Sequence, residues 1–389
     1  MRKLILVLLL LLSGCGSTRE LNELAVIIGM GLDYTEQEGY TITFQILNPA
    51  EAGSPGSSGG GGVPAFNVTG NSQSLGEAVK QAEAKLPREA FYQHLSLAVI
   101  GESLARHGTN DVIDLLERNP IIRSNLALLV AKGQTANSVL AGLTPLNQVP
   151  SLSAINVTKT NQESIGTAKN VTLIQFIQEE EYLDSFPLVS GIQLKGDPMA
   201  AGTKDNIDQT MPIKPTIEGL AVFSHDGKLL TWLNPEEAKY TLMINGDLKR
   251  TTISYPCGSS ENIYRVLVSK SRMSADFKDG KPILTASVKV SGELSMITCE
   301  TKELSKHWNK MEVNIAGYVE KEMAKTIAAA QDKGIDPFGF NEKIASKDLA
   351  HWNKIKDSWP ELFKKAEVRT KAKIELFRSG LMLDPKQNN

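Results

Sequence analysis

Cysteine is scarce in this sequence, because its 389 residues include only three, Cys15, Cys257 and Cys299. None of them forms a Cys-x-x-Cys pair, and the five histidines, at positions 94, 107, 225, 307 and 351, stand far apart. Structural zinc sites are built from about four closely spaced Cys or His ligands. We therefore predict no metal site and no cofactor.

Familiar catalytic signatures are also absent. The sequence contains no Ser-x-x-Lys, no His-Glu-x-x-His and no phosphate-binding P-loop, the patterns that mark several hydrolases and nucleotide enzymes. His94 begins an apolar segment without a neighbouring nucleophile pattern, which favours a core imidazole over a general base. We predict that the protein is not an enzyme, and an enzyme without a sequence signature stays open as the alternative.

Strong net charge is missing as well. The formal charge is −2, with 22% charged and 41% hydrophobic residues. This composition indicates neither a disordered chain nor a nucleic-acid binder. A length of 389 residues is enough for two or three domains, and no apolar run after the N-terminus reaches the roughly 20 residues of a membrane span.

The N-terminus carries the strongest targeting signal. Arg2 and Lys3 precede an apolar run from Leu4 to Leu12, and Leu12-Ser13-Gly14-Cys15 follows. The run has the length of a secretory signal, and small residues before a cysteine form the bacterial lipoprotein box. We predict a signal peptide over 1–14, a diacylglyceryl group and palmitate-like acyl chains on Cys15, and an extracytoplasmic protein tethered to the membrane. The alternative is an ordinary secreted protein in which Cys15 has no such role.

The two remaining cysteines allow one disulfide. An exported protein sits where disulfides persist, so Cys257 and Cys299 form a possible pair. The sequence leaves this pairing undecided, because it does not show whether their Cα atoms come within about 7 Å.

The first half of the chain has the pattern of an α/β domain, which we place at 15–195. Apolar residues over 24–32 and alternating ones over 40–46 predict a hairpin, and the Gly/Ser-rich stretch 53–62 predicts a mobile insertion. Ser74 and Glu77 form the capping box of a predicted helix. Apolar strands at 94–101 and 126–131, with a helix at 110–118 between them, predict a parallel sheet buried on both faces.

The second half is predicted to be a layer of helices on an antiparallel sheet. Residues 196–215 are polar and rich in Gly, Pro and Asp, which predicts an interdomain linker. We place a β-rich middle domain at 216–300 and a C-terminal helix-on-sheet domain at 301–389. Within the latter, apolar residues spaced by three or four predict a long helix ending at Gly334, a second helix from about Glu342, and a final strand over 366–376.

Four blocks of residues resemble the Ger(x)C spore germination lipoproteins, the C subunits of endospore germinant receptors. The first is Arg19-Glu20-Leu21 with Gly29, Gly31 and Asp33. The second runs from Phe91 to Glu102 and is followed by Ala105 and then Arg118-Asn119-Pro120. The third is Gly219–Phe223 with its Asp-Gly turn. The most specific is Asp336-Pro337-Phe338-Gly339-Phe340, followed by Trp352, Trp359 and Phe363.

Some positions depart from the family pattern. Gly16-Ser17 replace the usual Trp-Asp pair, and Asn341 stands where a second glycine is usual. The resemblance implies three α/β domains in all and a non-enzymatic subunit at the spore inner membrane. It also implies two integral-membrane partners, of A and B type, in a complex that senses small nutrients and is needed for germination.

The competing interpretations concern aromatic and basic residues. Trp308, Trp352 and Trp359 have the helical spacing of core residues, which favours a core role over a ligand cage. Acidic residues interspersed in the lysine-rich stretch 343–373 favour a solvated surface over a membrane contact. We expect a scaffold or coupling subunit that docks on membrane partners. The alternative is an extracytoplasmic lipoprotein that binds a small molecule directly.

Overall fold

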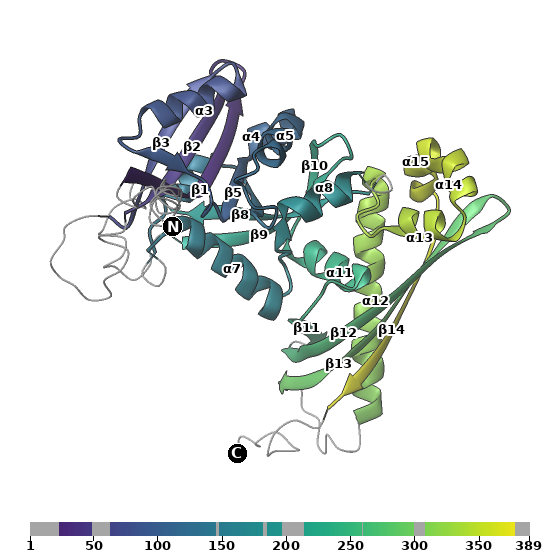
Figure 1. Cartoon of the computed structure of the whole chain (residues 1–389). Coiled ribbons are helices and arrows are strands. Elements are labelled where there is room, and N and C mark those ends of the chain that lie inside the picture. The colour runs from purple at the N-terminus through teal and green to yellow at the C-terminus, as the bar shows by residue number, and fades with distance from the viewer. Residues whose placement is uncertain are drawn as a thin grey trace, which may run out of the picture.

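A computed structural model describes residues 23–48, 63–144, 148–181, 185–196, 214–258, 260–298 and 308–377. Within these ranges the chain forms two β-sheets with helices packed on them (Figure 1). The mixed α/β class predicted from the sequence is confirmed. Cys15, Cys299 and the Gly/Ser-rich stretch 53–62 lie outside the described residues.

The larger sheet has ten strands. Its main path runs β10-β9-β8-β6-β5-β1-β2-β3, with β4 beside β1 and β7 beside β6. The strands are β1 (Leu24–Thr35), β2 (Gly39–Leu47), β3 (Ala65–Ser72), β4 (Glu89–Phe91), β5 (Leu97–Gly101), β6 (Ala127–Ala131), β7 (Val171–Thr172), β8 (Leu188–Lys195), β9 (Lys214–Phe223) and β10 (Leu229–Leu233). The predicted hairpin is the antiparallel pair β1 and β2.

The centre of this sheet is parallel and buried on both faces, as predicted. Strand β5 pairs in parallel with β1 and β6, and all of its residues are buried. Ala98 and Ile100 enter one core, whereas Leu97 and Val99 enter another. Helices α3 (Leu75–Ala84), α4 (Glu102–His107), α5 (Asn110–Arg118) and α8 (Leu173–Glu181) line the first core, and α6 (Ala136–Ala141) and α7 (Pro150–Ser164) line the second.

One local prediction in this half is wrong. Helix α3 begins after Ser74, but the Ser74 side chain makes no capping hydrogen bond. Instead, the Ser74 backbone N–H donates to the hydroxyl of Ser72 at 3.3 Å. The helix therefore forms where expected without the predicted capping box.

The strands on either side of the predicted linker belong to one sheet. Strand β8 ends at Lys195, β9 begins at Lys214, and the two pair antiparallel with Leu194 opposite Pro215. Backbone hydrogen bonds between β8 and β9 thus join the two ends of the stretch 196–215. Most residues of this stretch lie outside the described ranges. The start of the predicted middle domain, β9 and β10, is part of the first sheet instead.

The second sheet has the order β11-β12-β13-β14. Its strands are β11 (Thr251–Cys257), β12 (Ser260–Lys278), β13 (Lys281–Met296) and β14 (Glu367–Leu376). The first three pair antiparallel as predicted, but β14 runs parallel to β13. Because β13 and β14 pair along their length, the predicted boundary at residue 300 divides a single sheet.

Helices cover one face of this second sheet. Helix α11 (Pro235–Asn245) follows the first sheet, and α12 (Trp308–Lys333) lies along the second (Figure 1). The single helix predicted from about Glu342 is instead α13 (Phe340–Lys347), α14 (Leu349–Ile355), the turn η3 (Lys356–Ser358) and α15 (Trp359–Lys364). Asp348 interrupts the helix, because its extended backbone and its side-chain bond to the His351 N–H start α14 anew.

The two sheets share a core. Leu188, Leu220 and Val222 of the first sheet pack in the same buried cluster as Tyr264, Val288 and Ile315 of the second half. Helix α11 lies between them and contributes Leu242 and Met243. None of the helices described is long and apolar enough to span a membrane.

Candidate functional site at the junction of the two sheets

The family-like segment 336–340 is organised around one buried carboxylate. Asp336 is 1% exposed, and it accepts hydrogen bonds from the backbone N–H groups of Phe338 at 3.3 Å and Asn341 at 2.9 Å. The indole N–H of Trp359 donates to it at 3.3 Å. The segment can fold this tightly because Gly339 takes a left-handed backbone with φ of 82°.

Burial changes the acidity of this group. Desolvation raises the pKa of Asp336 to about 6, and the hydrogen bonds from Asn341, Phe340, Phe338 and Trp359 oppose that rise. The carboxylate therefore carries its charge at neutral pH at a cost in folding free energy. In this position it organises the chain between α12 and α13.

Two of the three tryptophans predicted to be core residues are buried. Trp352 and Trp359 are each 3% exposed and meet edge to face, with ring centroids 5.8 Å apart. The ring of Phe363 lies beside Trp359, tilted by 43°, with ring centroids 5.9 Å apart. Trp308 lies at the other end of α12 and donates to the carbonyl of Leu376 at 3.4 Å. The predicted core role is confirmed for Trp352 and Trp359, whereas Trp308 is half-buried and packs against the edge of that core.

A polar cavity of about 330 Å³ adjoins Asp336 where the two sheets meet. The segments that line it are the loop between α7 and β7, α8, β8, the end of α11, β12, the loop between α12 and α13, and the start of α13. Its lining residues are Lys169, Glu179, Ser185, Phe186, Leu188, Asn245, Asp247, Met273, Asp336, Pro337, Phe338, Gly339, Glu342 and Lys343. We take this cavity as the candidate functional site.

One lysine holds the two halves together at this cavity. The ammonium of Lys169 lies 2.7 Å from Glu179 and 3.3 Å from Asp247, which follows α11. Burial lowers the pKa of Lys169, but the two carboxylates raise it by more, so the net shift is upward. Nearby, the amide of Asn245 at the end of α11 donates to the carbonyl of Pro337 at 3.2 Å, which ties α11 to the segment before α13.

A further carboxylate, Glu342, lines the same cavity. Burial raises the pKa of Glu342 above its usual value, Lys343 and Lys169 oppose the rise, and the charges of Glu179 and Asp247 add to it. No sequence pattern pointed to Lys169, Glu179 or Asp247, because these residues meet only through the tertiary fold. A lysine held between carboxylates from both halves suits binding at the cavity or mechanical coupling of the halves. Among the residues that line the cavity, no nucleophile is paired with a base.

The Gly-x-Gly-x-Asp block in β1 is structural in the same way. Asp33 is 6% exposed and accepts from the N–H groups of Ala136 at 2.8 Å and Asn137 at 3.3 Å, at the start of α6. Desolvation raises its pKa to about 6, and these two bonds oppose the rise. A Cβ on Gly31 would lie 3.2 Å from that of Ala136, so the glycine lets α6 approach the strand.

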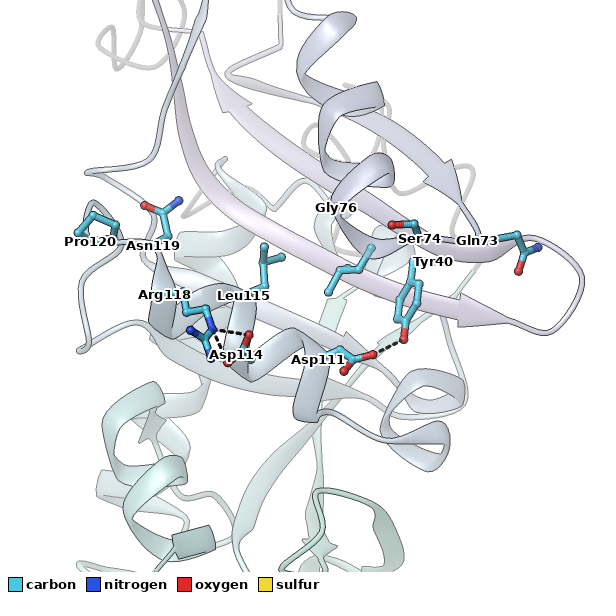
Figure 2. A pocket seen from close by; sticks show the side chains of 11 residues that line it. Tyr40, Gln73, Ser74, Gly76, Asp111, Asp114, Leu115, Arg118, Asn119 and Pro120 are labelled. Carbon is cyan, nitrogen blue, oxygen red and sulfur yellow. Dashed lines mark hydrogen bonds and ion pairs between the residues drawn. The ribbon is translucent and has the colours of Figure 1, made fainter.

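An open cleft of about 860 Å³ lies between α3 and α5, lined partly by Arg118, Asn119 and Pro120 of the second family-like block (Figure 2). In this view the hydroxyl of Tyr40 donates to Asp111 at 3.0 Å, and Arg118 pairs with Asp114 at 2.7 Å. Burial and the bond to Asp111 raise the pKa of Tyr40. The carboxylates of Asp111 and Asp114 therefore already have partners within the cleft.

The predicted cysteine sites are only partly described. Cys257 ends β11 and is disulfide-bonded. Its predicted partner Cys299 and the predicted lipid site Cys15 lie outside the described residues, so both assignments stay predictions. Among the residues that the structure describes, no group of three or more His, Cys, Asp or Glu side chains is arranged to hold a metal ion.

Comparison with known proteins gives matches along nearly the whole chain. Residues 17–184 match the model of the spore germination protein N-terminal domain, and residues 218–380 match that of the spore germination B3/GerAC-like C-terminal region. Spore germination protein KC of Bacillus subtilis is 27% identical, over 99% of this chain and 98% of its own length. Spore germination protein B3 of the same organism is 22% identical, over 96% of each chain.

A solved structure supports the fold. The crystal structure of the GerBC protein aligns with a TM-score of 0.58 and 17% identity, over 90% of this chain and 97% of that one. Taken together, two family models that cover most of the sequence and the buried Asp33 and Asp336 blocks show that this chain belongs to the Ger(x)C family of spore germination proteins.

Proposed function

We propose that this chain is the lipid-anchored, non-enzymatic subunit of a spore nutrient-germinant receptor. The observation that carries the proposal is the match of both family models together with relatives named as spore germination proteins KC, B3 and A3. In this role the folded body is a scaffold or coupling subunit at the spore inner membrane. It docks on two integral-membrane subunits of A and B type.

The anchor is proposed from the sequence. Leu12-Ser13-Gly14-Cys15 provides a lipoprotein box, and two acyl chains on one sulfur give stable attachment, since each buried methylene contributes about 0.8 kcal/mol. Cys15→Ala is expected to move the protein from the membrane fraction to the soluble fraction of spore lysates and to slow germination. Ser13→Ala is the matched control, because it keeps a small residue before the cysteine and leaves attachment intact. Membrane retention of the Cys15→Ala protein would contradict the anchor.

The receptor role is tested separately. A strain without the chain is expected to lose the response to one class of nutrient, measured as release of dipicolinic acid, and the wild-type copy to restore it. In detergent extracts of spore membranes, the tagged chain is expected to co-purify with two integral-membrane subunits. Normal germination of the deletion strain with every nutrient tested would remove the proposal.

Direct sensing of a small molecule is the second candidate function, and the junction cavity favours it. A volume of about 330 Å³ falls at the lower end of ligand pockets, and its walls come from both sheets. Calorimetry of the purified chain with single amino acids separates the candidates. The scaffold proposal expects no heat of binding, whereas micromolar affinity would establish the sensor.

A further inference from the structure

The face of the second sheet that points away from α12 carries rows of basic side chains. Strands β12, β13 and β14 are in register there, so residues on neighbouring strands stand directly opposite one another. Lys270 lies opposite Lys289, which lies opposite Lys373, so three lysines form one row across the sheet. The next row is Arg272, Ser287 and Lys371, and the one after it is Ser274, Thr285 and Arg369.

Five such rows have six cations and three carboxylates. The two outer rows are Val268, Ser291 and Glu375 at one end and Asp276, Ile283 and Glu367 at the other. Like charges directly opposite on adjacent strands destabilise a sheet. The arrangement of Lys270, Lys289 and Lys373 therefore costs stability that folding alone does not require.

Carboxylates at the ends of the face offset only part of this charge. Glu375 lies 2.8 Å from Lys289 and 3.4 Å from Lys373, and Glu367 pairs with Arg369 at 2.7 Å. Asp276 is engaged at 2.6 Å by Lys347 of α13. In the described part of the chain, Lys270, Arg272 and Lys371 have no carboxylate partner, and all three are exposed.

The two faces of this sheet differ sharply. Inward residues such as Ala275, Leu284 and Val288 are buried under the helices, whereas the outward residues between the cations are mostly short hydroxyl side chains. Ser274, Thr285 and Ser287 leave room between the long cations and add hydrogen-bond donors. Such a surface suits phosphate-bearing groups. In these five rows the large apolar side chains are Val268 and Ile283, one in each outer row, and no apolar patch lies between the cations.

We propose that the outward face of β12, β13 and β14 docks on an anionic phospholipid surface. The charge of the face is complementary to such a membrane, and each cation near it strengthens binding roughly fivefold. The contact is peripheral and depends on ionic strength, because it rests on charge. The proposal deepens the proposed membrane attachment but uses different residues, so an acyl chain on Cys15 and this face are separable.

The test uses the chain from residue 15 onward with Cys15→Ala, so that no acyl chain contributes. Sedimentation with vesicles of phosphatidylcholine and phosphatidylglycerol is expected to show binding that high salt abolishes. Vesicles of phosphatidylcholine alone are expected not to bind. Lys270→Glu, Arg272→Glu and Lys371→Glu combined are expected to weaken binding at least tenfold.

A control variant separates this face from the net charge. Lys354→Glu, Lys356→Glu and Lys365→Glu combined change the charge equally, at exposed positions of α14, η3 and the end of α15, and are expected to bind like the parent. Equal loss in both variants, or no binding of the parent to anionic vesicles, would overturn the proposal. Neither result bears on attachment through Cys15, which the fractionation experiment decides alone.

Discussion

The side-chain carboxylate of Glu320 on α12 accepts a hydrogen bond of 2.8 Å from the backbone N–H of Ala372 on β14. Eight residues earlier on the helix, Glu312 accepts at 2.9 Å from the N–H of Leu376. Eight helical residues span about 12 Å and four strand residues about 13 Å, so the two spacings match. Strand β14 is at the edge of its sheet. Helix α12 therefore supplies hydrogen-bond acceptors to two backbone N–H groups of this edge strand.

Removing these acceptors should weaken and expose the edge. Glu312→Ala with Glu320→Ala is expected to lower the free energy of unfolding by about 2 kcal/mol, because each deleted acceptor leaves an N–H without its partner. An unprotected edge also pairs with other chains, so more dimer and aggregate is expected in size-exclusion chromatography. Glu312→Gln with Glu320→Gln keeps a side-chain oxygen and is the control. Unchanged urea midpoints and elution for the alanine variant would refute this role.

Asp336 should give the protein a specific pH dependence. Its pKa is raised from 3.8 to about 6 in the folded state, so between these values the folded chain binds more protons than the unfolded chain. The contribution of this group to stability is therefore highest below about pH 4 and is lost as pH rises toward 6, by about 3 kcal/mol.

The measurement compares Asp336→Asn with the wild type at several pH values. Because Asp33 and all other groups are common to both chains, the difference in unfolding free energy isolates Asp336. Relative to the variant, the wild type is expected to lose stability between pH 4 and 6 and to change little above that range. Two parallel stability curves would show that the carboxylate does not titrate in this window.

Lys169 should matter more than an ordinary surface lysine. Lys169→Met leaves Glu179 and Asp247 facing each other across the junction, and we expect a loss of about 2 kcal/mol in thermal or urea unfolding. This loss of unfolding free energy is smaller than the loss expected on breaking a fully buried ion pair, because Glu179 and Asp247 are partly solvated. Lys325→Met is the control, since its pair with Glu322 is 3.5 Å long and Lys325 is 75% exposed. Equal effects of the two changes would argue against a bridging role.

Patterns with strong periodicity predicted the fold well, and weak ones did not. The strands β5 and β6 were predicted correctly from their apolar runs. Helix α12 was predicted from the spacing of Met311, Ile315 and Val319. Helices α7 and α11 were not predicted. Of these, α7 mixes buried Ser151, Ser153 and Thr158 with its apolar residues, so no clear stripe marks it.

Capping illustrates why local signals mislead. Asn234 and Glu237 form a real capping box at the start of α11, whereas the same pattern at Ser74 and Glu77 does not. In the second case the Ser74 N–H already binds Ser72. Of the candidate site, the 336–340 block could be predicted from the family resemblance. The pair of Lys169 and Asp247 could not, because the two residues are 78 positions apart in the sequence and meet only in the folded structure.

Two glycines near α3 provide a matched pair for the last prediction. A Cβ on Gly70 of β3 would lie 2.3 Å from the carbonyl oxygen of Ala78 and 2.3 Å from the N atom of Ala82. Because both atoms belong to helix backbone, Gly70→Ala must push α3 away from the sheet and open the core around Ala78 and Ala82. We expect a loss of at least 2 kcal/mol, in the range of overpacked cores.

Gly76 lies only six residues further on, in the first turn of the same helix, and a Cβ there meets nothing within 4 Å. Gly76→Ala should therefore stabilise the protein by about 0.5–1 kcal/mol, since alanine favours the helix and restricts the unfolded chain. Urea unfolding of the two variants should move in opposite directions. A shift of both in the same direction would mean that chain entropy, and not the contact of β3 with α3, decides the effect at Gly70.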